Sequence, residues 1–219
     1  MSLYVCVYVP NGLVISADSR TTGSGYVHSD RTNKVFLLFE RIGIATTGNA
    51  YAGTKSIEQC VKEFEMRHEG FKEEHPYTIC LNLKSYLEEI PGIGSVNFLV
   101  CAYDGTEPYV YAFNTFKKYS DNEELQRTNL NDDESALAYG VTRNGDIEIA
   151  NRLINPDYLP QFTIMNLQDA IDYSRHLIRA TIDQMRFEPR AATVGGPIDT
   201  LLIEPGGSRY IKKKQLTAD

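Results

Sequence analysis

The sequence of 219 residues predicts an α/β protein, a four-layer αββα sandwich in which two mainly antiparallel sheets pack together between outer helices. Two observations lead to this prediction. Strand-like and helix-like segments follow each other as strands, two helices, strands, two helices and closing strands. The first strands are also apolar at nearly every position, which is typical of sheets covered on both faces. Two packed sheets with helices outside satisfy both.

The first block of strands contains two predicted hairpins. Residues 3–9 and 12–16 are rich in β-branched and aromatic side chains, and the Pro-Asn-Gly sequence at 10–12 supplies a tight turn between them. Residues 34–39 and 41–47 repeat the arrangement across a polar turn. We therefore expect four strands before the first helix.

Two amphipathic helices are predicted next. The first has Ile57, Cys60, Val61 and Phe64 on one face, at the spacing of a helix, and Gly70 is its expected stop. The second is expected to begin at Pro76, a residue favoured in the first turn, and to end before Pro91 and Gly92. The spacing of apolar residues and the positions of Pro and Gly therefore predict two helices here.

The second half of the chain repeats the order of strands and helices. Strands are predicted at 95–104 and 108–114, helices at 146–153 and 166–185, and a closing strand at 197–205. No low-complexity segment or linker interrupts the pattern. We therefore expect a single domain over residues 1–219.

The composition is that of a soluble globular protein, with 42% apolar and 23% charged residues and no apolar run that could span a bilayer. No secretory signal is visible, and the four cysteines are scattered, so we expect reduced core thiols and a cytoplasmic location. The net charge of −7 argues against nucleic acid as a partner, and the lysines at 212–214 are interpreted as a solvated tail. The four histidines lack ligand spacing, and no cofactor motif is present, so neither a metal nor a cofactor is expected.

Three polar residues are expected to meet at one end of a sheet. Asp18 ends the second strand, Lys34 opens the third, and Ser2 precedes the first. Neighbouring strands lie about 4.8 Å apart, so these side chains could converge. The alternative is that Asp18 only ends a strand and pairs with Arg20 or Lys34.

These segments resemble the proteasome β-subunits and their bacterial relatives among the N-terminal-nucleophile (Ntn) hydrolases. The resemblance lies in GLVISADSRTTGSGYV at 12–27, DRTNKVF at 30–36 and IGIATTGNAYAG at 42–53, and it extends to VGGPIDTLLI at 194–203. The end of the chain is also similar to Anbu, a bacterial proteasome relative. The resemblance implies the Ntn-hydrolase fold, and one register without gaps assigns the catalytic positions to Ser2, Asp18, Lys34 and Gly48, and the substrate pocket to Thr21, Thr46 and Ala50.

The resemblance implies a self-assembling peptidase that hydrolyses peptide or other amide bonds. In such enzymes the N-terminal hydroxyl residue is the nucleophile and its own amine is the base. The implied partners are a peptide or protein substrate and further copies of the chain, and any unfolding ATPase is unknown. The chain departs from the family in having serine as the nucleophile, and Ala191 and Val194 at two positions that are polar in the family. The alternative is therefore a catalytically inactive assembly subunit.

Overall fold

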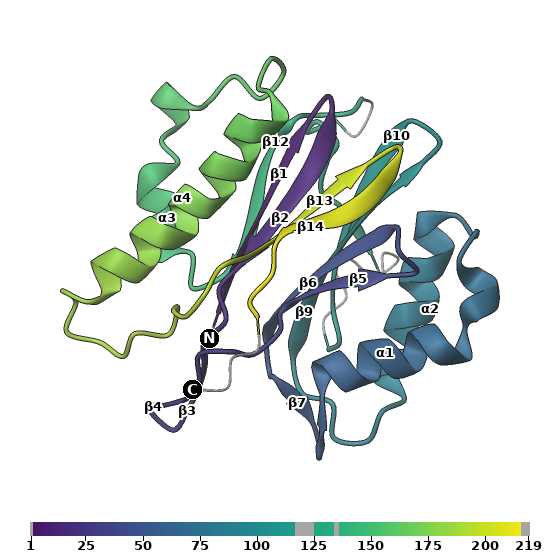
Figure 1. Ribbon diagram of the computed structural model, residues 1–219, viewed down its shortest axis with the longest axis horizontal. Coiled ribbons are helices and arrows are strands. Elements are labelled where there is room, and N and C mark those ends of the chain that lie inside the picture. The colour runs from purple at the N-terminus through teal and green to yellow at the C-terminus, as the bar shows by residue number, and fades with distance from the viewer. Residues whose placement is uncertain (1, 117–124, 134–135, 216–219) are drawn as a thin grey trace.

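The computed structural model describes residues 2–116, 125–133 and 136–215, and it has the predicted four layers (Figure 1). Every strand pairing in the two five-stranded sheets is antiparallel. The first sheet has the order β12-β1-β2-β13-β14, from Gly140–Gly145, Leu3–Val9, Gly12–Ala17, Asp199–Glu204 and Gly207–Lys212. The second has the order β11-β10-β9-β6-β5, from Gln126–Arg127, Glu107–Asn114, Val96–Asp104, Ile42–Gly48 and Val35–Leu38.

Each sheet carries one pair of helices on its outer face (Figure 1). Helices α1 (Ile57–Arg67) and α2 (Pro76–Glu88) cover the second sheet, and α3 (Glu148–Leu153) and α4 (Leu167–Met185) cover the first. The remaining elements are the two-stranded sheets β3–β4 and β7–β8 and two 3-10 turns, at Thr21–Gly23, Tyr26–Ser29, Tyr51–Ala52, Lys55–Ser56, Glu69–Phe71 and Pro156–Tyr158.

The helix ends follow local side-chain chemistry. Ser56 and Gln59 form a reciprocal capping box at the start of α1, and Pro76 occupies the first turn of α2 as predicted. The prediction that Gly70 stops α1 was wrong. The helix ends at Arg67, because the backbone N–H of His68 closes the last turn and a 3-10 turn follows.

Apolar side chains fill three layers: one between the sheets and one under each helix pair. The layer between the sheets includes apolar residues that face each other on β2 and β13, such as Ile15 opposite Leu201. All four cysteines are free and buried, as expected, and Sγ of Cys6 lies 3.6 Å from Sγ of Cys101 across the two sheets. Burial raises the pKa of the Cys101 thiol well above its usual range.

Three strands of the two five-stranded sheets were not predicted, namely β11, β12 and β14, and neither were the four short strands of the two-stranded sheets. β12 and β14 lie at the edges of the first sheet, and their sequences, GVTRNG and GSRYIK, are largely polar because only one side of an edge strand is paired. The interpretation of the lysines at 212–214 as a solvated tail also needs correction. Lys212 and Lys213 are exposed, but the side chain of Lys214 is only 6% exposed and pairs with Asp199.

No helix within the described residues is long and apolar enough to cross a bilayer.

Candidate active site

Ser2 lies at the entrance to β1 and is 6% exposed. Its carbonyl oxygen accepts a hydrogen bond of 2.7 Å from the backbone N–H of Asp146. Gly145 makes this approach possible: it has φ +107°, and a Cβ atom there would lie 1.8 Å from the Ser2 oxygen. The residue after β12, Asp146, therefore holds the peptide group between Ser2 and Leu3 in place.

Asp18 lies directly after β2 and is 1% exposed. Its carboxylate accepts four hydrogen bonds: from the N–H of Leu3 at 2.9 Å and Nζ of Lys34 at 2.8 Å on one oxygen, and from the N–H groups of Arg20 and Gly195, each at 3.0 Å, on the other. Of the two pairings considered from the sequence, the side-chain ion pair is therefore with Lys34. Asp18 joins the start of β1 to the segment that precedes β13.

Lys34 lies one residue before β5, and its side chain is 6% exposed. Its ammonium group donates to the Asp18 carboxylate and to the carbonyl oxygen of Arg20. Burial lowers the pKa of Lys34, and the charge of Asp18 opposes that shift. The lysine is thus a desolvated cation with a fixed partner.

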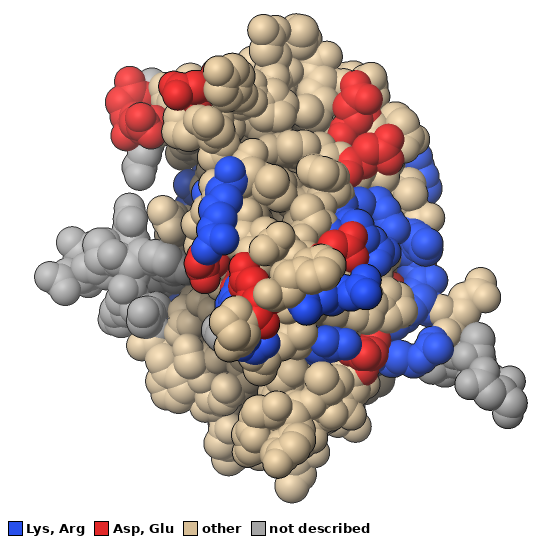
Figure 2. Space-filling view, turned by 90° about the vertical axis from the view of Figure 1, so that its left-hand side faces the viewer, with Lys and Arg blue, Asp and Glu red and all other residues tan. Residues whose placement is uncertain are grey.

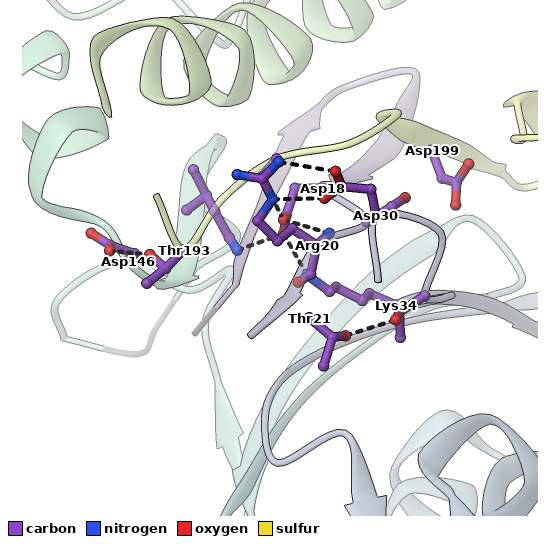
Figure 3. A network of polar contacts seen from close by, with 12 residues as sticks. Asp18, Arg20, Thr21, Asp30, Lys34, Asp146, Thr193 and Asp199 are labelled. Atoms are coloured by element: carbon purple, nitrogen blue, oxygen red, sulfur yellow. Dashed lines mark hydrogen bonds and ion pairs between the residues drawn. The ribbon is translucent and has the colours of Figure 1, made fainter. Parts of the chain in front are cut away.

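Arg20 continues the network away from Lys34 (Figure 3). Its guanidinium group binds both carboxylate oxygens of Asp30, at 2.6 and 3.0 Å, and also donates to the carbonyl oxygen of Ala192. The hydrogen bond from Arg20 holds the pKa of the Asp30 carboxyl below its usual value. This two-point contact fixes the loop that carries Lys34.

A second buried carboxylate was not identified from the sequence. Asp146 was expected to begin a helix, but α3 starts at Glu148 and the Asp146 side chain turns to the segment before β13. It accepts from Oγ1 of Thr193 at 2.6 Å and from Nη1 of Arg190 at 2.8 and 3.1 Å. Ala191 and Val194 are apolar, but Thr193 between them supplies a hydroxyl group that binds the Asp146 carboxylate. Asp146 and Thr193 are 47 positions apart, so no local sequence pattern could indicate that they form a pair.

One cavity of about 820 Å³ is lined by six of the seven residues that the family register assigned to the site, namely Ser2, Thr21, Lys34, Thr46, Gly48 and Ala50. The seventh, Asp18, lies behind Lys34. Gly48 ends β6 with φ +102°, where a Cβ atom would lie 2.4 Å from the carbonyl oxygen of Ser95. A glycine is therefore required there, and it leaves the backbone accessible beside the cavity.

The cavity is more polar than the three proposed pocket residues suggested. The cavity lining also includes His28, Arg31, Asn33 and Glu58, and the Glu58 carboxylate accepts from Nδ2 of Asn33 at 2.9 Å. No sequence pattern indicated that these side chains face the same cavity. Among the described residues, no group of three or more His, Cys, Asp or Glu side chains could hold a metal ion.

Comparison with known proteins supplies one family. The family model described as proteasome subunit matches residues 3–118, just over half of the chain. No curated protein matches. The match covers Asp18, Lys34 and Gly48 and begins one residue after Ser2.

Proposed function

The chain belongs to the proteasome subunit family, and we propose that it is a self-assembling peptidase with Ser2 as its nucleophile. The observation that carries the proposal is the buried Asp18–Lys34 ion pair, whose lysine lines one cavity with Ser2 and Gly48. A buried lysine carries a desolvation cost even when it is paired, and perturbed ionisable groups in a cavity are typical of active sites.

The first step is acyl transfer to Ser2. The free α-amine of Ser2 takes the proton of its own hydroxyl group, and Oγ attacks the carbonyl carbon of the peptide bond. The oxyanion that forms accepts a hydrogen bond from the N–H of Gly48, an interaction of about 3 kcal/mol in sites of this kind. The protonated amine then returns the proton to the leaving nitrogen as the C–N bond breaks.

The second step is hydrolysis of the ester. Water loses a proton to the α-amine and attacks the ester carbonyl, and Ser2 Oγ leaves and takes that proton back. The Lys34 cation disfavours protonation of the amine in both steps, which keeps it a base near neutral pH. This chemistry requires that Ser2 has a free amine, and therefore that Met1 is removed.

The proposed pocket for the side chain before the scissile bond is formed by Thr21, Thr46 and Ala50. All three are uncharged, and Ala50 leaves room, so we expect a preference for apolar side chains of medium size. A peptide library cleaved with a clear preference for acidic or basic residues at that position would contradict this assignment.

The proposed assembly consists of further copies of the chain, as is usual for proteasome subunits. The side that carries α3 and α4 has large exposed apolar residues, Leu153, Tyr158, Ile164 and Phe187, near the ends of these helices. Lys and Arg side chains, with Asp and Glu side chains among them, lie across the middle of this side (Figure 2). Such a surface suits contact between subunits. Light scattering at micromolar concentration is expected to give an oligomer, and a monomer would contradict the proposal.

The test of the mechanism is Ser2→Ala in protein whose intact mass shows that Met1 has been removed. The variant is expected to lose hydrolysis of a peptide that the parent cleaves, while circular dichroism and gel filtration remain unchanged. Full activity in Ser2→Ala would overturn the mechanism. A parent that has a free Ser2 amine and cleaves no peptide would favour the alternative, an inactive assembly subunit.

A further inference from the structure

A second buried Asp–Lys pair lies beside the first. Asp199 is 2% exposed and is the first residue of β13, directly opposite Ala17, which precedes Asp18. Its carboxylate accepts from the backbone N–H of Lys214 at 2.7 Å and from the Lys214 ammonium group. Both side chains are almost fully buried, at 3% and 6% exposure. Taking two charges out of water is expensive.

The pair lies on the side of the sheet that faces Lys34. Cross-strand partners point to the same face, and Ala17 belongs to the apolar layer between the two sheets, so Asp199 faces that layer too. Figure 3 shows Asp199 at the start of β13, on the Lys34 side of the site. The C-terminal hairpin also contacts the strand that follows Lys34, because the hydroxyl group of Tyr210 donates to the carbonyl oxygen of Val35 at 3.0 Å.

The segment after β14 is tied to the site at a further point. Nη1 of Arg31 donates to the carbonyl oxygen of Gln215 at 3.0 Å, and Arg31 follows Asp30, the partner of Arg20. The residues before β13 run beside the residues after β2, since Ser19 bonds to the carbonyl oxygens of Gly195 and Pro197. The segment after β14 therefore contacts the loop that carries Lys34.

We propose that Asp199 and Lys214 are positioning residues of the candidate active site, whose opposite charges set how readily Lys34 and the Ser2 amine bind a proton. The inference rests on the proposed function. Lys214 adds a cation to those that act on Lys34 and so weakens proton binding there. The same charge is proposed to act on the amine of Ser2, which lines one cavity with Lys34, and Asp199 holds that cation in place and partly offsets it.

The other charges around Lys34 act in known directions. Burial and the cations of Lys214 and Arg20 lower the pKa of Lys34, and Asp18 raises it. Asp30 is neutralised by its two-point contact with Arg20. Asp199 and Lys214 can be replaced separately to change the local charge, because neither supplies any of the four hydrogen bonds of Asp18.

The test uses two variants with opposite expected signs. Lys214→Met removes the cation, so the acid limb of the kcat/KM profile for a fluorogenic peptide is expected to move to higher pH, by about 0.5 to 1 unit. Asp199→Asn removes the anion, so the limb is expected to move to lower pH by a similar amount. Lys212→Met is the matched control, because this lysine is exposed on β14, and no shift is expected.

If the pair had a purely structural role, the acid limb of the pH profile would move in the same direction in both variants, or in neither. Two shifts in one direction, or none, would overturn the proposal, and if one variant fails to fold, the sign of the other decides. Competitive acetylation of Lys34 at a series of pH values, measured by mass spectrometry, gives the same comparison without substrate. If the parent cleaves no peptide, the proposed function fails, while opposite shifts in acetylation would still support the charge effect.

Discussion

Two buried carboxylates lie on either side of the start of β1, and they are used in different ways. Asp18 accepts with its side chain from the N–H of Leu3, whereas Asp146 donates its backbone N–H to the carbonyl oxygen of Ser2. Asp18 pairs with a buried lysine, and Asp146 pairs with Arg190, whose side chain is 30% exposed. One region therefore supplies charge near Ser2, the proposed nucleophile, and the other fixes the Ser2 backbone.

This difference predicts which charges matter for catalysis. Lys34 faces the cavity with Ser2, while Arg190 reaches Asp146 from the side that is open to solvent. Lys34 is expected to keep the Ser2 amine unprotonated and therefore able to act as a base. Arg190 holds Asp146 and is expected to affect only the position of the Ser2 backbone. The two basic residues can be compared by the same substitution.

The largest expected effect is that of Lys34→Ala on activity. Loss of the cation lets the Ser2 amine become protonated, so kcat/KM for a cleaved peptide is expected to fall by about 10² to 10⁴. Arg190→Ala is the matched comparison and is expected to cost less than about tenfold. Both variants must first be shown to be folded and assembled. An equal loss in both would remove the distinction between the two regions.

The next effect concerns stability. Asp18→Ala leaves the Lys34 ammonium group buried without its carboxylate, which is expected to cost about 3–5 kcal/mol in the free energy of unfolding. Asp146→Ala is expected to cost about 1–3 kcal/mol, because Arg190 can turn toward water and the backbone N–H to Ser2 is retained. Denaturant titration at equal protomer concentration measures both, since assembly itself stabilises the fold. The reverse order of losses would contradict the assigned roles.

The same comparison explains what the sequence could predict. Asp18 follows one strongly apolar strand and Lys34 precedes another. The hairpin pattern and the strand spacing were therefore enough to predict that both lie near Ser2. Gly48 and the pocket residues came from the family register. In contrast, Asp146 follows a polar edge strand, and its partners are more than 40 residues away in the sequence.

The corrected residues share one physical cause. Lys214 looked like part of a solvated run of lysines, but a buried acid on a neighbouring strand, Asp199, pairs with it. Ala191 and Val194 indicated that polar contacts are lost here, but Thr193 between them donates to Asp146, which comes from the other side of β1. Pairs of this kind depend on how distant strands lie side by side, and neither periodicity nor charge pattern records that.

The smallest predicted effect isolates the backbone-fixing region. Thr193→Val keeps the volume of the side chain but removes the hydroxyl group that donates to Asp146 at 2.6 Å. The loss of this one hydrogen bond is expected to cost about 0.5–1 kcal/mol in stability, less than Asp146→Ala, because Arg190 still pairs with the carboxylate. Thr193→Ser restores the donor and is the control.

The kinetic reading of this pair of variants decides whether the Asp146 region acts on position or on charge. If Asp146 only fixes the Ser2 peptide group, Thr193→Val should lower kcat by a few fold and leave the acid limb of the pH profile where it is in the parent. Thr193→Ser should recover the rate. A shift of the limb in Thr193→Val, absent in Thr193→Ser, would instead mean that the Asp146 carboxylate influences the Ser2 amine directly, and both flanking carboxylates would then belong to the charge system of the site.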